Sequence, residues 1–206
     1  MRKLFTALAA MAALSFAAPA SAQVTLLTDA NGILTGATGV NVNGSLYNVS
    51  FADGTCGGLF SGCDSVSDFN FQNATDATAA AQALLDQVFI DSFDTHPATI
   101  SGCTDLSWCF TFIPYAVFTQ TNEALISYTT NNFTVATDTA FSGGFWQFSE
   151  NTALRPDANV ALFTYTGSSI TAVPEPATWA MMLLGFGSIG FQMRRQRKQG
   201  PLAQAA

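Results

Sequence analysis

The stretch Gly39-Val-Asn-Val-Asn-Gly-Ser-Leu-Tyr-Asn-Val-Ser-Phe51 predicts a β-hairpin. Apolar and polar residues alternate before and after Asn43-Gly44, the strongest two-residue signal for a tight turn between paired strands. Successive side chains of a strand point to opposite faces, so this alternation separates a core face from a solvent face. The core face of the hairpin should carry Val40, Val42, Tyr47, Val49 and Phe51.

Further strands are predicted in the C-terminal half, where segments rich in aromatic and β-branched residues follow one another at hairpin spacing. Pro114 interrupts the first of them, because proline cannot donate a hydrogen bond to a neighbouring strand. A small polar linker, residues 166–171, is expected after the last strand. The predicted strands are Trp108–Phe118, Glu123–Thr130, Asn132–Thr137, Gly144–Ser149 and Asn159–Thr166.

One amphipathic helix is predicted between these groups of strands, at residues 76–89. Thr75 or Asp76 is suited to cap it, and the segment contains no glycine or proline. Apolar residues recur at three- and four-residue spacing, so one side of the helix should pack on the sheet. That side comprises Ala77, Ala81, Leu84, Leu85, Val88 and Phe89. The pattern predicts a β-rich α+β fold, an antiparallel sheet or sandwich with one main soluble helix.

The first 22 residues have the three regions of a secretory signal peptide. A basic start, Arg2-Lys3, precedes an apolar signal helix over residues 4–18 and a small-residue cleavage site that ends at Ala22. We expect the secretion machinery to export the chain across the inner membrane and signal peptidase to cleave between Ala22 and Gln23. An uncleaved N-terminal anchor is the alternative.

Four cysteines lie in two close pairs, Cys56 with Cys63 and Cys103 with Cys109. In an exported protein this favours two disulfides over a metal cluster, and the two-residue spacing of zinc and redox motifs is absent. Of the three possible connectivities, we expect the two local pairs. Each bridge closes a short loop and should stabilise the fold by about 2–3 kcal/mol.

Three features follow one another near the C-terminus. Pro-Glu-Pro at 174–176 should end the exported domain, because proline breaks strands and helix interiors, whereas a proline suits the first position of a helix. The mostly apolar residues 177–193 predict a single transmembrane helix. The basic residues after it, Arg194, Arg195, Arg197 and Lys198, should keep the far end in the cytoplasm.

This ending resembles the PEP-CTERM sorting signal of Gram-negative bacteria. The resemblance covers residues 173–198 and rests on Pro174, Glu175, Pro176, Trp179, Ala180, Met181, Met182, Gly185, Phe186, Gly187, Arg194 and Arg195. It implies processing near Pro-Glu-Pro by an exosortase, a membrane-embedded protease or transpeptidase, in a cell that makes an exopolysaccharide. It also implies transient membrane anchoring through the C-terminal helix, then delivery to the cell surface or the biofilm matrix. A simple C-terminal anchor is the alternative.

The predicted organisation is a signal peptide at 1–22, an exported β-rich domain at 23–172 and a sorting signal at 173–199. The net charge of the whole chain is −7. Thirteen of the fourteen acidic residues lie in the exported domain, but Arg155 is its only lysine or arginine, so its net charge is near −12. So acidic a domain should repel nucleic acid and anionic lipid, and we expect neither as a partner.

The exported domain carries few motifs for chemistry. It has no Gly-x-Ser-x-Gly nucleophile turn and no phosphate-binding glycine loop, and no carboxylate pair stands out for a glycosidase. Asp91, Asp94 and His96 lie close in sequence, but they lack the ligand pattern of a calcium-binding loop. We therefore expect no catalytic residue, no metal and no cofactor.

The main functional expectation is a non-catalytic structural or exopolysaccharide-associated role at the cell surface or in the matrix. The first alternative is a carbohydrate-binding or adhesion module that uses exposed aromatic rings, and the second is a secreted hydrolase with an unidentified carboxylate pair. Exposure of Trp108 or Trp146 on a shared face would favour carbohydrate binding, and burial of both would favour a structural role. The candidate platform residues are Tyr47, Trp108, Tyr115, Tyr128, Phe145 and Trp146.

Overall fold

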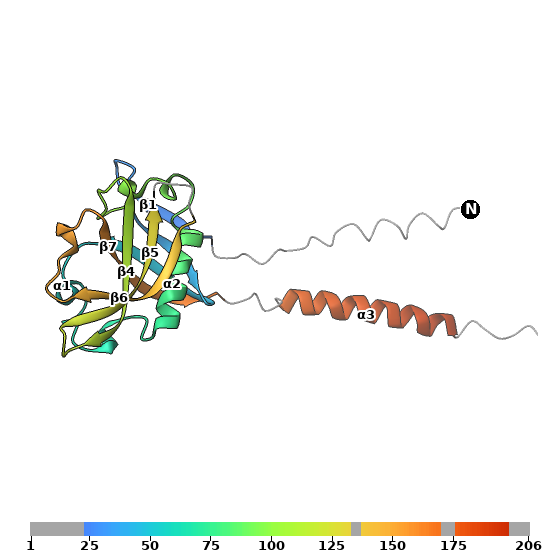
Figure 1. The fold of residues 1–206 in the computed structure, drawn as a ribbon. Helices are drawn as coiled ribbons and strands as arrows, with labels where there is room; N and C mark the ends of the chain where they lie inside the picture. Colours follow the sequence, from blue (N-terminus) through green and yellow to red (C-terminus); the bar gives the residue numbers. More distant parts are fainter. Residues whose placement is uncertain (1–22, 133–136, 170–175, 198–206) are drawn as a thin grey trace, which may run out of the picture. The chain divides into compact units, whose positions relative to one another are not determined.

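Seven strands form one mixed sheet in the computed structural model, which describes residues 23–132, 137–169 and 176–197. The strands are β1 Thr25–Thr28, β2 Leu34–Val42, β3 Ser45–Ala52, β4 Trp108–Phe118, β5 Glu123–Asn132, β6 Thr139–Gln147 and β7 Ala158–Ser168. Their order across the sheet is β1-β2-β3-β7-β4-β5-β6 (Figure 1). Neighbours are antiparallel except β4 and β7, which are parallel. The β-rich fold is confirmed, but the wholly antiparallel sheet is wrong, because β7 returns to the middle of the sheet, between β3 and β4.

The hairpin predicted from residues 39–51 is confirmed as β2 and β3. Val42 pairs with Ser45 across the turn, and both turn residues have positive φ, 50° at Asn43 and 85° at Gly44. Asparagine and glycine tolerate this left-handed conformation, and such a turn matches the twist of the paired strands. All five expected core residues belong to the main core or pack against it.

The strands of the C-terminal half differ from prediction in several places. Strand β6 begins five residues before the predicted 144–149 and ends two residues earlier, and β7 includes residues 166–168 of the expected linker. Asn132 is the last residue of β5 rather than the first of a separate strand, and residues 133–136 lie outside the described part of the chain. Pro114 lies within β4, where the pairing register with β5 shifts between Pro114 and Ala116. A bulge leaves a residue without a ladder hydrogen bond, so the strand continues through a proline that has no N–H to donate.

Helix α2 spans Ala74–Gln87, two residues earlier than predicted at each end. Its cap is Asn73 rather than Thr75 or Asp76, because the Asn73 side chain accepts a hydrogen bond from the backbone N–H of Asp76 at 2.9 Å. This bond satisfies one of the N–H groups left unpaired in the first turn. At the other end, the Gln87 amide exchanges two hydrogen bonds of 2.8 and 2.9 Å with the backbone of Asn41 in β2.

The sheet curves around α2, since the helix contacts β2 as well as β4, β5 and β6, which lie far from β2 in the strand order (Figure 1). The main core fills the space between them. It is built from small alanines on the helix, which allow close approach, and larger side chains on the strands. The helix contributes Ala77, Ala80, Ala81, Ala83 and Leu84, and the residues just after it contribute Val88 and Phe89.

The opposite face of the sheet has a smaller core of its own. In β5, Ser127 bonds to Thr78 of α2, whereas the neighbouring Ile126 packs in this second core, so the two cores lie on opposite faces. The segment from Cys56 to Phe69 covers the second core, with the short helices α1, Cys56–Leu59, and η1, Val66–Asp68. The fold therefore has three layers over part of the sheet.

Two disulfides, Cys56–Cys63 and Cys103–Cys109, are the local pairs expected from the sequence. The first closes the segment that covers the second core. The second joins β4 to the loop before it. Three short 3-10 helices complete the described part of the domain: η2 Asp91–Phe93, η3 Pro97–Thr99 and η4 Thr152–Leu154.

Residues 22–169 form one compact unit, and helix α3, Pro176–Arg197, belongs to another. Among the described residues, no helix has the length and apolar content needed to cross a bilayer, so the prediction of a transmembrane helix at 177–193 is wrong. The physical reason is that Pro176, Thr178, Ser188, Gln192 and three glycines dilute the apolar side chains. The structure likewise gives no support to transient anchoring through this helix.

Several predicted sites fall on residues that the structure does not describe. The signal peptide with Ala22, and Pro174 and Glu175 of the sorting motif, lie outside the described ranges. Pro176, Trp179 and Arg195 are placed in helix α3 by their backbone only, whereas Arg194 is exposed. Gln23 begins the described chain, two residues before β1.

Candidate functional site

Four aromatic rings form a continuous strip across β4, β5 and β6, on the sheet face opposite α2. Trp108 and Phe110 lie two residues apart on β4, with parallel rings 6.4 Å between centroids. Phe110 meets Tyr128 of β5 edge to face at 6.1 Å, and Tyr128 stacks on Phe141 of β6 at 5.6 Å. Both end rings are accessible, with Trp108 48% and Phe141 46% exposed. We call these four residues the aromatic strip.

A groove of about 250 Å³ runs beside the aromatic strip and uses its two central rings. Gly144 on β6 leaves room for it, because a Cβ at this position would come within 2.9 Å of Ile126 Cγ1 and 3.0 Å of Tyr128 Cε1. Real Cβ atoms essentially never approach so closely, so a larger residue would displace the Tyr128 ring. The groove is lined by Phe110, Phe112, Ile126, Tyr128, Gly144, Phe145 and Arg155.

Arg155 provides the polar part of the groove. Its guanidinium lies over the Phe112 ring, 5.5 Å from the centroid, and makes bonds of 2.8 Å to Glu150 and of 2.9 and 3.2 Å to the two oxygens of Asp157. The bidentate bond from Arg155 holds the pKa of Asp157 below its ordinary value, and both carboxylates raise the pKa of Arg155. All three side chains remain partly exposed; Arg155 itself lines the groove, and the two carboxylates border it through their bonds to Arg155.

The six aromatic residues proposed as a platform divide into two sets. Trp108, Tyr128 and Phe145 belong to the aromatic strip or line the groove. Trp146 is completely buried, and its indole N–H donates to the Glu150 carbonyl at 3.2 Å. Tyr115 and Tyr47 lie in or against the main core. Trp108 is therefore part of the aromatic strip. Trp146 is not, because its side chain lies in the second core under the segment closed by the Cys56–Cys63 disulfide.

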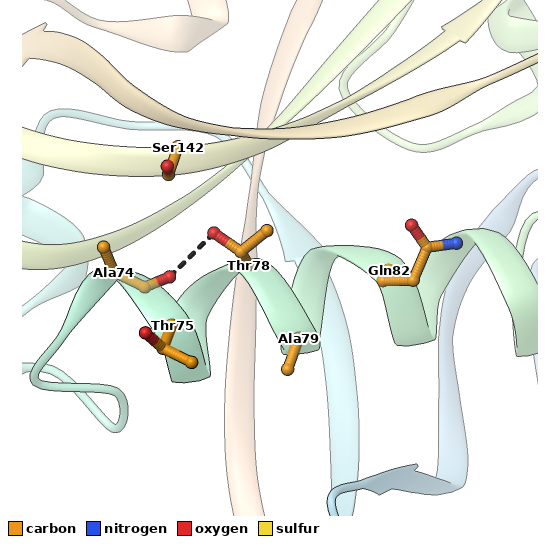
Figure 2. A pocket seen from close by; sticks show the side chains of 6 residues that line it. All are labelled: Ala74, Thr75, Thr78, Ala79, Gln82 and Ser142. Carbon is orange, nitrogen blue, oxygen red and sulfur yellow. Dashed lines mark hydrogen bonds between the residues drawn. The ribbon is translucent and has the colours of Figure 1, made fainter.

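An open depression of about 450 Å³ lies on the other side of the sheet, between the first turns of α2 and Ser142 of β6 (Figure 2). Thr78 donates a hydrogen bond to the Ala74 carbonyl at 2.7 Å and shares another with Ser127 at 2.9 Å. The side chains that line the depression are alanines, hydroxyls and the Gln82 amide, none of them ionisable. This depression therefore offers neither the rings nor the charges that the groove provides.

The carboxylates Asp94 and Asp138 lie together near the ends of β5 and β6. Burial is the main cause that raises the pKa of Asp138 to about 6, the backbone N–H of Asn132 opposes the rise, and Asp94 adds to it. His96, the remaining candidate of this region, contacts the Ser92 carbonyl through Nδ1 at 3.0 Å. Across residues 23–132, 137–169 and 176–197, no three His, Cys, Asp or Glu side chains gather as a metal ion would require.

The aromatic strip and the groove include several residues that the sequence did not indicate as site residues: Phe110, Phe112, Ile126, Phe141, Gly144 and Arg155. Part of the signal was available, because Trp108, Phe110 and Phe112 alternate along one predicted strand and must share a face. The register that brings Phe141 opposite Tyr128 was not, since it depends on a bulge in the β5–β6 pairing.

The domain defined by these features is acidic, β-rich and disulfide-bonded, with an aromatic groove on one face. A family model described as the PEP-CTERM protein-sorting motif matches residues 172–198. The chain therefore carries this sorting motif, as the resemblance predicted, and the motif marks an exported surface protein with an exosortase as its processing partner. No curated protein and no solved structure matches the chain.

Proposed function

We propose that the exported domain is a non-catalytic module of the cell surface or extracellular matrix that binds exopolysaccharide through the aromatic strip and its groove. The sorting motif supports delivery to that location. The observation that carries the binding role is the aromatic strip, whose end rings are about half exposed. Large rings normally bury most of their surface in a core, so accessible rings beside a groove favour a contact with a ligand.

The chemistry of the groove suits a sugar chain. The apolar faces of pyranose rings stack on aromatic side chains, while their hydroxyls need donors and acceptors at the edge. Arg155 lines the groove, and Glu150 and Asp157 are bonded to it, so donors and acceptors lie at this edge in positions that the Arg155 bonds fix. A strip that crosses three strands also suits a polymer, which can contact several rings at once.

The same residues favour binding over hydrolysis. A glycosidase needs a carboxylic acid that is protonated at neutral pH, which requires a raised pKa. In the groove, Arg155 instead lowers the pKa of Asp157 and occupies Glu150 with an ion pair of 2.8 Å. Asp138, whose carboxyl has a raised pKa, does not line the groove. Asp157, held ionised by Arg155, is therefore unsuited to act as the general acid.

The test is retention of the purified chain on the exopolysaccharide of its own host. We expect Trp108→Ala combined with Phe141→Ala to weaken binding at least about tenfold, since stacking on a ring is worth about 1 kcal/mol or more at each position. Phe118→Ala is the matched control, because Phe118 is also about half exposed but does not line the groove. Trp146→Ala is unsuitable, because it would leave a large cavity in the second core.

Binding that survives loss of both end rings would refute the role of the aromatic strip. Lack of retention of the unchanged protein on the polysaccharide would refute carbohydrate binding as a whole. Circular dichroism of the unchanged protein and of each variant shows whether the fold is intact.

A further inference from the structure

We infer that the groove selects glycans that carry free amino groups over neutral and acidic glycans, an inference that rests on the carbohydrate-binding role proposed above. Stacking on aromatic rings alone does not distinguish among these classes, since sugars of all three present apolar ring faces. The distinction comes from charge, both over the whole domain and at the groove itself.

The charge of the domain sets the long-range preference. A net charge near −12 on residues 23–172 creates a negative potential over its surface. Such a potential concentrates cations and repels polyanions, which changes association rates and local concentrations by large factors at low salt. Glycans rich in carboxylate or sulfate are thereby disfavoured, neutral glycans are unaffected, and polycationic glycans are attracted.

At the edge of the groove, the cluster of Arg155 with its two carboxylate partners has the same net sign. Arg155 is the only lysine or arginine of the domain, and two carboxylates, Glu150 and Asp157, bind it. The three groups together carry one net negative charge. The side chains of Glu150 and Asp157 are 28% and 30% exposed, so a ligand can reach them. A carboxylate accepts up to about four hydrogen bonds, which leaves acceptor sites for an ammonium group beside Arg155.

The Trp108 end of the aromatic strip provides a second negative group. Asp105 precedes β4, and its Oδ1 accepts hydrogen bonds from the backbone N–H groups of Ser107 at 2.6 Å and Trp108 at 3.2 Å. This arrangement fixes a carboxylate close to the start of the strip. Trp108 itself attracts cations, because the faces of indole rings bind ammonium groups more strongly than those of other aromatic side chains. An amino sugar would meet favourable charge at both places.

The experiment compares four oligosaccharides of equal length by calorimetry with the full-length protein. They are a glucosamine oligomer with free amines, the same oligomer after N-acetylation, a glucose oligomer and a uronic acid oligomer. At mildly acidic pH and low salt, we expect the free-amine oligomer to bind about tenfold more tightly than its N-acetylated form. This preference should shrink at about 0.3 M salt, where the Debye length falls to roughly 6 Å.

Two variants assign the preference to the groove. Glu150→Gln should reduce the tenfold preference for the free-amine oligomer over its N-acetylated form to about threefold. Asp86→Asn is the matched control, because it removes the same charge from an exposed position on α2, on the other face of the sheet, and should leave the preference unchanged. Equal effects of both variants would show a general charge effect and overturn the assignment to the groove.

The outcomes separate this inference from the proposed function. If the neutral or N-acetylated oligomer binds as tightly as the free-amine oligomer, selectivity for amino groups is refuted and carbohydrate binding stands. Tighter binding of the uronic acid oligomer refutes it as well. If none of the four oligosaccharides nor the host polysaccharide binds, carbohydrate binding itself fails.

Discussion

At the scale of a single residue, Gly102 and Gly143 share one backbone conformation, but replacing each by a residue with a Cβ should destabilise the fold by different amounts. Gly102 and Gly143 have φ values of 89° and 88°, which side chains with a Cβ rarely adopt. A Cβ at Gly143 would meet no atom within 4 Å. At Gly102 it would lie 2.7 Å from the Cβ of Asn159 and 2.8 Å from a carboxylate oxygen of Asp53. Only Gly102 therefore combines backbone strain with a steric clash, against the buried Asn159 and the Asp53 carboxylate.

Gly143→Ala should lower the free energy of unfolding by about 1–2 kcal/mol, the cost of forcing a residue with a Cβ into the left-handed region. Gly102→Ala should lower it by about 3 kcal/mol or more, because Asn159 or the Asp53 carboxylate must also move. Urea unfolding of both variants measures the difference. Equal losses would show that the space around Gly102 relaxes at no cost.

At the scale of elements, what could be predicted from sequence depended on whether the signal was local. Asn43-Gly44 fixes its turn by itself, and the limits of β4 were correct at both ends because its composition is distinctive. The helix cap was misplaced by two to three residues, since Asn73, Thr75 and Asp76 are all residues that can cap a helix and only the three-dimensional contact decides among them.

Non-local pairings could not be predicted in the same way. Nothing in the sequence of β7 shows that it enters the sheet between β3 and β4 and runs parallel to β4. The groove depends on such pairings, because its residues come from β4, β5 and β6 and from the loop before β7. This is why Trp108 could be proposed from the sequence as a platform residue while Arg155 could not.

Asp138 joins the end of β5 to the start of β6 by hydrogen bonds, and its carboxyl should make the stability of this junction depend on pH. It precedes β6, and one of its oxygens accepts hydrogen bonds from the backbone N–H of Asn132 at 3.1 Å and from its side-chain amide at 2.7 Å. Burial, opposed by the Asn132 N–H and reinforced by Asp94, raises its pKa from 3.8 to about 6. A carboxyl with a raised pKa in the folded state favours folding most where it is protonated in both states, below its ordinary pKa.

The free energy of unfolding should therefore fall as the pH rises from about 4 through about 6. The loss due to Asp138 should be on the order of 1 kcal/mol once solvent screening is allowed for. Asp138→Asn keeps an oxygen to accept both bonds from Asn132 and cannot ionise, so its free energy of unfolding should lack this decline. Urea unfolding at a series of pH values measures the difference, with Asp86→Asn as a control for net charge. Parallel curves for the unchanged protein and Asp138→Asn would contradict the role of this carboxyl.

At the scale of the whole molecule, charge is separated by position along the chain. The exported domain has a net charge near −12, whereas the other six lysines and arginines lie in residues 2–3 and 194–198. The proposed preference for glycans with amino groups follows from this acidic surface, and four of the six other basic residues lie in the matched sorting motif. Residues 22–169 also form a compact unit distinct from helix α3, so removal of the sorting motif would leave the domain's cores and both disulfides untouched.

The sorting motif predicts that an exosortase cleaves the chain before Arg194. In cells with an active exosortase, the intact mass of the surface protein should correspond to a chain that lacks Arg194 and all residues after it, and deletion of the exosortase should preserve them. Pro174→Ala with Pro176→Ala should have the same effect as the deletion, because both prolines belong to the matched motif. Pro201→Ala, which lies beyond residues 172–198, should be processed normally. If the surface protein still carries Arg194 in cells with the exosortase, the motif is not a cleavage signal in this chain. If the double variant is processed normally, the exosortase does not recognise the two prolines.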